Sequence, residues 1–244
     1  MIIQKNMEAK TNLFVLKDKI NETNDVATLK FSPVEGNISL FISGQFVNVY
    51  FLDDRCVGQG KPYSISSIPG GDFLSITVKK IGKFSGALHD LKIGEKVKVS
   101  EPQGYFYPED KNNNVVFLAG GIGITPFYSI IKNCFKKQKN KNIVLFYSNK
   151  TRDDAVFLNE LKDLANNWSN FKIINVFTRE KAEMSGVKNL ETERIGVSMI
   201  KKYLKTLNGN YYFICGSIGF VRDLWKELKE NEVQEDFIKV ESFY

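Results

Sequence analysis

The glycine-rich run at residues 119–126, Ala-Gly-Gly-Ile-Gly-Ile-Thr-Pro, has the residue types and spacing of a phosphate-binding turn. It directly follows an apolar run at residues 115–119 that is typical of a buried strand. Glycines let the backbone approach a ligand closely, Thr125 could cap the following helix, and Pro126 suits its first turn. The free N–H groups of a helix N-terminus attract phosphate. Because the run is neither G-x-G-x-x-G nor a P-loop, a tight turn that binds nothing remains the alternative.

Four further clusters could contribute chemistry, although each also has a purely structural interpretation. Their sequences are Lys61-Pro62-Tyr63-Ser64, Gly82-Lys83-Phe84-Ser85, Cys215-Gly216 and Glu241-Ser242-Phe243 with Tyr244. In the first cluster a lysine could pair with phosphate, a tyrosine could stack on an aromatic ring and a serine could donate to a ring nitrogen. A cysteine at a strand end is usually packing, and an aromatic tail is more often frayed than functional.

The elements that must position these clusters differ between the two halves of the chain. In the first half, short runs rich in β-branched and aromatic residues alternate with turn residues, at 13–19, 26–31, 45–51, 63–68, 73–80 and 96–100. This spacing predicts an antiparallel barrel, with one short helix at 85–91 before the last strand.

The second half alternates apolar strands with amphipathic helices. Strands are expected at 115–119, 143–147, 173–177, 211–215 and 237–240, and helices at 125–136, 155–166, 197–207 and 218–229. Such alternation predicts a doubly wound α/β parallel sheet. The polar segment at 107–113 marks the boundary, so we expect a barrel domain at 1–110 and an α/β domain at 111–244.

Composition excludes several classes of protein. The chain of 244 residues is 43% hydrophobic and 25% charged, which is typical of globular domains. The net charge of +6 comes from scattered lysines rather than a basic arm, and one histidine with three cysteines outside any C-x-x-C pair argues against a zinc or iron–sulfur site. No apolar stretch reaches ~18 residues and no signal-peptide h-region opens the chain, so a cytoplasmic location is expected.

Taken together, the five clusters in this order and spacing resemble the ferredoxin–NADP reductase superfamily from about residue 13 to the C-terminus. The resemblance implies a flavin-binding antiparallel barrel followed by a nicotinamide-binding α/β domain. The residues that it assigns to the flavin are Lys61, Pro62, Tyr63, Ser64, Thr77, Val78, Lys79, Gly82, Phe84 and Ser85, with Phe243 or Tyr244 covering the ring. Those that it assigns to the nicotinamide dinucleotide are Gly121, Gly123, Ile124, Thr125, Thr178, Arg179, Cys215 and Gly216.

The resemblance gives three residues catalytic roles. Ser64 would hydrogen-bond near flavin N5, Cys215 would place the nicotinamide C4 against N5, and Glu241 would shape the electrostatics and proton supply there. His89 is expected to be structural or close to the cofactor. One departure is Lys61, where the superfamily usually has an arginine that grips a pyrophosphate bidentately.

The function implied is a flavoprotein that moves electrons between NAD(P)H and a protein acceptor through FAD. NADPH is preferred over NADH because Arg179 resembles a residue that reads the 2′-phosphate. The implied acceptor is a small acidic carrier, ferredoxin or flavodoxin, or a partner oxygenase component, since a basic chain suits an acidic partner. The alternatives are a free-flavin or ferric reductase and a regulatory subunit without turnover.

Overall fold

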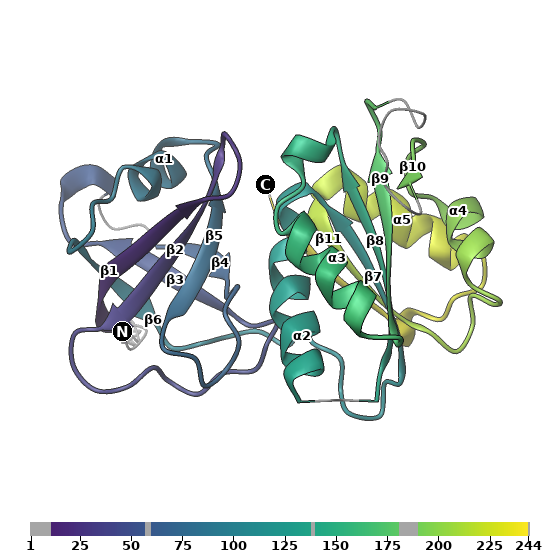
Figure 1. Ribbon diagram of the computed structural model, residues 1–244, viewed down its shortest axis with the longest axis horizontal. Helices are drawn as coiled ribbons and strands as arrows, with labels where there is room; N and C mark the ends of the chain where they lie inside the picture. Colours follow the sequence, from purple (N-terminus) through teal and green to yellow (C-terminus); the bar gives the residue numbers. More distant parts are fainter. Residues whose placement is uncertain (1–10, 57–59, 138–139, 181–189, 244) are drawn as a thin grey trace, which may run out of the picture.

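The computed structural model describes residues 11–56, 60–137, 140–180 and 190–243. These form two sheets side by side, each with its own helices (Figure 1). The two-domain fold expected from the sequence, a barrel followed by a doubly wound sheet, is confirmed. The boundary at residue 110 falls in the segment between the two sheets and stays a prediction. Within the described residues, no helix has the length and apolar character needed to cross a bilayer.

The first sheet is an antiparallel barrel of six strands. They are β1 (Thr11–Asn21), β2 (Val26–Pro33), β3 (Phe46–Phe51), β4 (Lys61–Ser64), β5 (Leu74–Lys79) and β6 (Lys96–Ser100), in the order β4-β3-β6-β1-β2-β5. A single bridge between Ile65 and Ile76 joins the two ends of this order and nearly closes the barrel. The alternating strands bury one face each, and fully buried Leu16, Leu29 and Val97 belong to that core.

Most barrel elements differ from their predicted bounds by a few residues, and two of them bear on the site. The strand expected at 63–68 is β4, which starts at Lys61 and ends at Ser64. The helix expected at 85–91 is α1 (Lys83–His89), which starts two residues earlier because Ser85 accepts hydrogen bonds from the N–H groups of Ile81 and Gly82 and so caps the turn before it.

The second sheet is parallel, with helices on both faces (Figure 1). Its strands are β7 (Asn114–Gly120), β8 (Asn142–Asn149), β9 (Phe171–Phe177), β10 (Leu190–Glu191), β11 (Tyr211–Ser217) and β12 (Ile238–Phe243), in the order β10-β9-β8-β7-β11-β12. Helices α2 (Ile124–Lys136) and α3 (Leu158–Asn167) cover one face, and α4 (Val197–Tyr203) and α5 (Ile218–Glu230) cover the other.

Three predictions for this sheet need correction. Helix α3 starts at Leu158 rather than at 155, because Phe157 before it has a left-handed backbone with φ of 61°. Helix α4 ends at Tyr203, where Leu204 becomes extended. The tail expected after residue 240 is instead strand, since Glu241, Ser242 and Phe243 continue β12 alongside β11.

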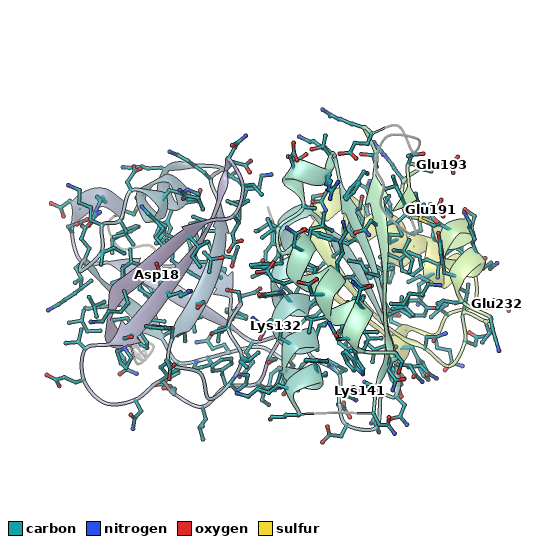
Figure 2. All side chains as sticks on the ribbon, viewed as in Figure 1. Asp18, Lys132, Lys141, Glu191, Glu193 and Glu232 are labelled. Carbon is teal, nitrogen blue, oxygen red and sulfur yellow. The ribbon has the colours of Figure 1, made fainter. Side chains whose placement is uncertain are left out.

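A buried lysine fixes the segment that joins the domains. The Lys141 ammonium donates to the carbonyl oxygens of Glu109, Asp110 and Asn112 at 2.7, 3.2 and 2.8 Å, and the side chain is 3% exposed. Lys141 lies at the lower end of the α/β domain in Figure 2. A second contact between the domains is the Ser129 hydroxyl on α2, which donates to the Ser67 carbonyl at 2.6 Å. Lys141 thus anchors the joining segment to the α/β domain, and Ser129 links that domain to the barrel.

Candidate functional site

A cavity of about 720 Å³ lies between the barrel and the α/β domain. Its walls contain many of the residues that the sequence singled out. From β4, β5 and α1 with its preceding glycine these are Lys61, Pro62, Tyr63, Ser64, Thr77, Lys79, Gly82, Phe84 and Ser85, and from the α/β domain they are Thr125 and Phe243. Both domains therefore contribute to one site, which we call the flavin cavity because it fits that group in the respects described next.

Ser64 presents an unsatisfied hydroxyl to this cavity. Its side chain is 4% exposed, and within the described chain Oγ has no hydrogen-bond partner. The bridge between Ile65 and Ile76 makes Ser64 and Thr77 direct neighbours on β4 and β5, and both line the cavity. A buried polar atom without a partner costs free energy. A ligand with a ring nitrogen, such as a flavin, would satisfy it.

Aromatic side chains form another wall of the flavin cavity. The rings of Tyr63 and Phe84 are stacked at 6.3 Å, and Phe51 packs against Phe84 at 5.0 Å. Tyr63 is half-buried and lines the cavity, so an aromatic ring system could stack on it. Lys61 is exposed at the cavity rim, where an ammonium can meet a phosphate.

Three expected flavin contacts are arranged differently from the prediction. Phe84 and Ser85 lie inside the first turn of α1 rather than ahead of it, and the Ser85 hydroxyl donates to the Gly82 carbonyl. Val78 does not line the cavity. Its side chain points into the barrel core, because successive residues of a strand face opposite sides. Lys79 lines the cavity and pairs with Asp25 at 3.1 Å.

The glycine run brings the start of α2 against the end of β11. A Cβ on Gly123 would lie 2.2 Å from the Cys215 carbonyl oxygen, so only glycine permits this approach. Gly121 adopts a φ of 54°, which also favours glycine. The expected N-cap role of Thr125 is wrong: it is the second residue of α2, and its hydroxyl donates to the Ile122 carbonyl at 2.6 Å. Ile124 is fully buried beside it.

The order of the parallel sheet places this run at a topological switch point. From β7 the chain moves outward through β8, β9 and β10, and then returns to the other side of β7 as β11. Ligands of open α/β sheets bind at the carboxyl ends of strands at such a point. The glycine run and the Cys215-Gly216 pair end β7 and β11 there. A Cβ on Gly216 would lie 3.3 Å from the Gly120 Cα, which shows how closely the two strand ends approach.

Cys215 and Glu241 lie opposite each other on β11 and β12. Burial raises the pKa of the Cys215 thiol well above its ordinary value, so the thiol stays protonated and is a poor nucleophile. Burial also raises the pKa of Glu241 to about 7, which suits a carboxyl that exchanges protons near neutral pH. Neither side chain lines the flavin cavity, whereas Ser242 and Phe243 do.

The remaining predicted residues lie away from the cavity or outside the described chain. Thr178 and Arg179 are exposed after β9, and their N–H groups donate to the carbonyls of Asn149 and Lys150 at the end of β8. The His89 Nε2 lies 2.8 Å from the Val78 carbonyl oxygen, and its role, structural or close to the cofactor, stays a prediction. Tyr244 is outside the described residues.

Sequence reasoning missed five residues that line the flavin cavity: Cys56, Ile81, Lys83, Ile122 and Ser242. Four of them sit inside or beside motifs that it identified, and this adjacency was the available signal. Cys56 closes a short 3-10 helix after β3 and carries no such signal.

Among the described residues, no cluster of histidine, cysteine and carboxylate side chains is suited to hold a metal.

Comparisons with known proteins agree with this geometry. Residues 117–226 match the oxidoreductase NAD-binding domain family. Over 94% of its length the chain is 26% identical to a flavohemoprotein of Bacillus cereus, and it spans 60% of that protein. It is 30% identical to a glycine betaine monooxygenase reductase subunit of Chromohalobacter salexigens, covering 92% of this chain and 62% of that one.

A solved structure shows the same fold. The ferredoxin–NADP+ reductase of Neisseria gonorrhoeae, with bound FAD and NADP, superimposes with a TM-score of 0.82 at 22% identity, covering 97% of this chain and 100% of that one. Residues 117–226 thus resemble an oxidoreductase NAD-binding domain, and the chain spans 60% and 62% of the lengths of the two curated relatives. The fold is therefore that of a ferredoxin–NADP+ reductase, in agreement with the resemblance seen in the sequence, and the FAD and NADP bound in the Neisseria gonorrhoeae structure are the cofactors expected for this chain.

Proposed function

We propose that the chain transfers a hydride from NAD(P)H to FAD in the flavin cavity and passes the electrons singly to a protein acceptor. The observation that carries this proposal is the arrangement of one cavity between the Ser64 hydroxyl of the barrel and the glycine run of the α/β domain. The flavin, when bound, supplies the redox chemistry, and the protein supplies position and electrostatics.

The chain's own residues divide these tasks. Lys61 and the first turn of α1 hold phosphates, and Tyr63 supports the ring. Ser64 donates a hydrogen bond to the ring edge. The approach of Gly123 to Cys215 aligns the nicotinamide, which matters because hydride transfer requires close and well-oriented atoms. Glu241 holds a proton at a pKa of about 7 beside this place.

The proposed acceptor is a small acidic electron carrier, ferredoxin or flavodoxin. The net charge of +6 supports an acidic partner, because complementary charge speeds association. The names of the two relatives support two other acceptors, a haem domain and an oxygenase component. The chain spans only about three-fifths of these relatives, so a further domain or subunit as acceptor is part of the proposal. The cytoplasmic location expected from the sequence also stays a prediction.

An absorbance spectrum before and after anaerobic NADPH tests the proposal. We expect a bound flavin that bleaches with NADPH and recovers when oxidised ferredoxin or flavodoxin is added. The variant Ser64→Ala should slow bleaching, whereas Ser43→Ala, which removes another buried hydroxyl without a partner in the described chain, should not. Flavin that leaves the protein on purification would favour a free-flavin reductase. Bound flavin that NADPH and NADH both fail to bleach would favour a regulatory subunit.

A further inference from the structure

A second cavity, of about 350 Å³, lies between the barrel and helices α2 and α3. We call it the inter-domain cavity. Its barrel side includes Glu22 and Thr28, and its α/β side includes Lys132 and Glu160. Lys132 lies on the side of α2 that faces the barrel (Figure 2). The proposed function assigns this cavity no role.

A chain of hydrogen bonds connects the two cavities through the barrel wall. The Thr28 hydroxyl lies 2.6 Å from Glu22 Oε1 and 2.9 Å from the Thr77 hydroxyl, its direct partner across β2 and β5. The Thr77 hydroxyl lies 3.0 Å from Ser66 Oγ. Thr77 lines the flavin cavity, whereas Glu22, Thr28 and Ser66 line the inter-domain cavity. Thr28, Thr77 and Ser66 are only 3–6% exposed, so these hydrogen bonds are shielded from bulk water.

The charge of Glu22 determines which group donates in each of these hydrogen bonds, because each hydroxyl has one proton to donate. With Glu22 ionised, Thr28 donates to the carboxylate, and the Thr77 hydroxyl, which donates to Ser66 Oγ in this structure, has to turn toward Thr28. With Glu22 protonated, the carboxyl donates to Thr28, Thr28 donates to Thr77, and the Thr77 proton is free for Ser66 or for a group in the flavin cavity. Reversing the direction of these hydrogen bonds moves the charge of one proton across the barrel wall, although no heavy atom moves.

The surroundings of Glu22 suit a group that gains and loses a proton. The titratable side chains that share the inter-domain cavity with it are Lys30, Asp72, Tyr128, Lys132 and Glu160. Burial, and to a smaller extent the charge of Glu160, raises the pKa of Glu22, whereas the hydrogen bond from Thr28 and the charges of Lys30 and Lys132 lower it. The Lys132 ammonium donates to the Tyr128 hydroxyl at 3.0 Å, which keeps it in the cavity. Burial lowers the pKa of Lys132.

We propose that Glu22, Thr28 and Thr77 form a proton relay between the inter-domain cavity and the flavin cavity. A hydride brings two electrons and one proton, so a second proton must reach the site if its charge is to stay unchanged. The relay delivers that proton from the Glu22 carboxyl, leaving a carboxylate that solvent reprotonates through the inter-domain cavity. When the electrons leave for the acceptor, protons return by the same route. Thr77 is positioned for this role because it lines the flavin cavity, and the inference rests on flavin occupying that cavity.

Infrared difference spectroscopy of the flavin-loaded protein tests the relay. The flavin is reduced by an external photoreductant without any nicotinamide nucleotide, and the reduced-minus-oxidised spectrum is followed in time. In the wild-type protein we expect reduction to remove a protonated-carboxyl band that is absent from the Glu22→Gln spectrum. Any band of Glu241, whose pKa burial also raises, is assigned separately with Glu241→Gln. Thr28→Val should slow the loss of the band at least about tenfold, since it interrupts the relay. Ser129→Ala is the matched control, because it removes a buried hydroxyl from the same interface outside the relay and should leave the rate unchanged.

A Glu22→Gln difference spectrum with the same carboxyl bands as the wild type, or a Thr28→Val rate equal to the wild-type rate, would overturn the relay. If Thr28→Val does not fold, Thr28→Ser replaces it as the test. This variant keeps the hydroxyl, so the carboxyl band must be lost at the wild-type rate. The Glu22→Gln spectrum then still shows whether Glu22 is the carboxyl that loses its proton. Failure of NAD(P)H to reduce the flavin would overturn the proposed function alone, because photoreduction needs no nucleotide. A protein that binds no flavin would overturn both.

Discussion

Replacing Glu241 by glutamine should change how the stability of the flavin-free protein depends on pH. Burial beside β11 raises the pKa of this carboxyl from 4.5 to about 7 in the folded protein. In the unfolded chain the carboxyl is solvated and its pKa returns to the ordinary value. The folded state therefore binds the proton more tightly, and ionisation of Glu241 opposes folding.

The sign and the size of the effect follow from these two pKa values. Below pH 4.5 Glu241 does not lower the free energy of unfolding, because it is protonated in both states. As the pH rises from 4.5 toward 7 it lowers this free energy by a growing amount, and above pH 7 the amount is constant. Each pKa unit corresponds to about 1.36 kcal/mol, so the free energy of unfolding should fall by about 2.5 kcal/mol between about pH 5 and about pH 8 through this group alone. Glutamine does not titrate, so Glu241→Gln should lose that part of the slope.

Urea unfolding at several pH values measures the difference. The quantity of interest is the wild-type free energy of unfolding minus that of Glu241→Gln, which should decrease by about 2.5 kcal/mol across this range. Glu230→Gln is the control, because this carboxylate is exposed on α5 with 60% of its side chain accessible, and its curve should parallel the wild type. Parallel curves for the wild type and Glu241→Gln would refute the inference that Glu241 is held protonated by burial.

Three further predictions concern the two halves of the site. Gly123→Ala should destabilise the fold by about 1–3 kcal/mol in urea unfolding, because its Cβ would overlap the backbone of β11, whereas Gly219→Ala, with open space around its Cβ, should not. Lys61→Ala should weaken flavin binding roughly 10- to 100-fold in a fluorescence titration, since it removes a charge-assisted contact of ~1.5–3 kcal/mol. The control is Lys98→Ala, which removes an exposed lysine on β6. Equal flavin affinities of Lys61→Ala and the wild type would show that Lys61 is not part of the site. Arg179→Ala should lower kcat/KM for NADPH and leave that for NADH unchanged; equal losses, or a wild-type preference for NADH, would contradict a 2′-phosphate contact.

The local features of the fold could be predicted from the sequence because short-range rules determine them. Strand alternation indicated the barrel, and continuous apolar strands between amphipathic helices indicated the parallel sheet. The glycine run was identifiable because a close approach and a left-handed backbone both require glycine, as Gly123 and Gly121 show. The hydrogen bonding of this run could not be predicted, since the Thr125 hydroxyl has the Ile122 carbonyl within reach and donates to it instead of capping the helix.

Features that depend on pairing between distant segments were beyond sequence reasoning. Residues 241–243 look like a tail when read alone, and they become strand only because β11 offers an edge for parallel pairing. Similarly, Thr28 and Thr77 are two ordinary strand threonines until the register of β2 and β5 places them opposite each other. Whether Val78 faces the cavity or the core also depends on strand phase, because a shift of one residue reverses the side on which each side chain lies.

The place of β11 in the sheet has a consequence for the order of folding. It pairs with β7, from which it is separated in the chain by β8, β9, β10 and the helices between them. Such a distant pairing is slow to form, and until it does β7 presents an unpaired apolar edge that can aggregate. The contact between Gly123 and Cys215 cannot exist before this pairing, so the nicotinamide-binding half of the site is completed only when β11 docks. A nucleotide that binds only the docked form would therefore act as a folding ligand as well as a substrate, protecting the sheet during the step at which it is most exposed.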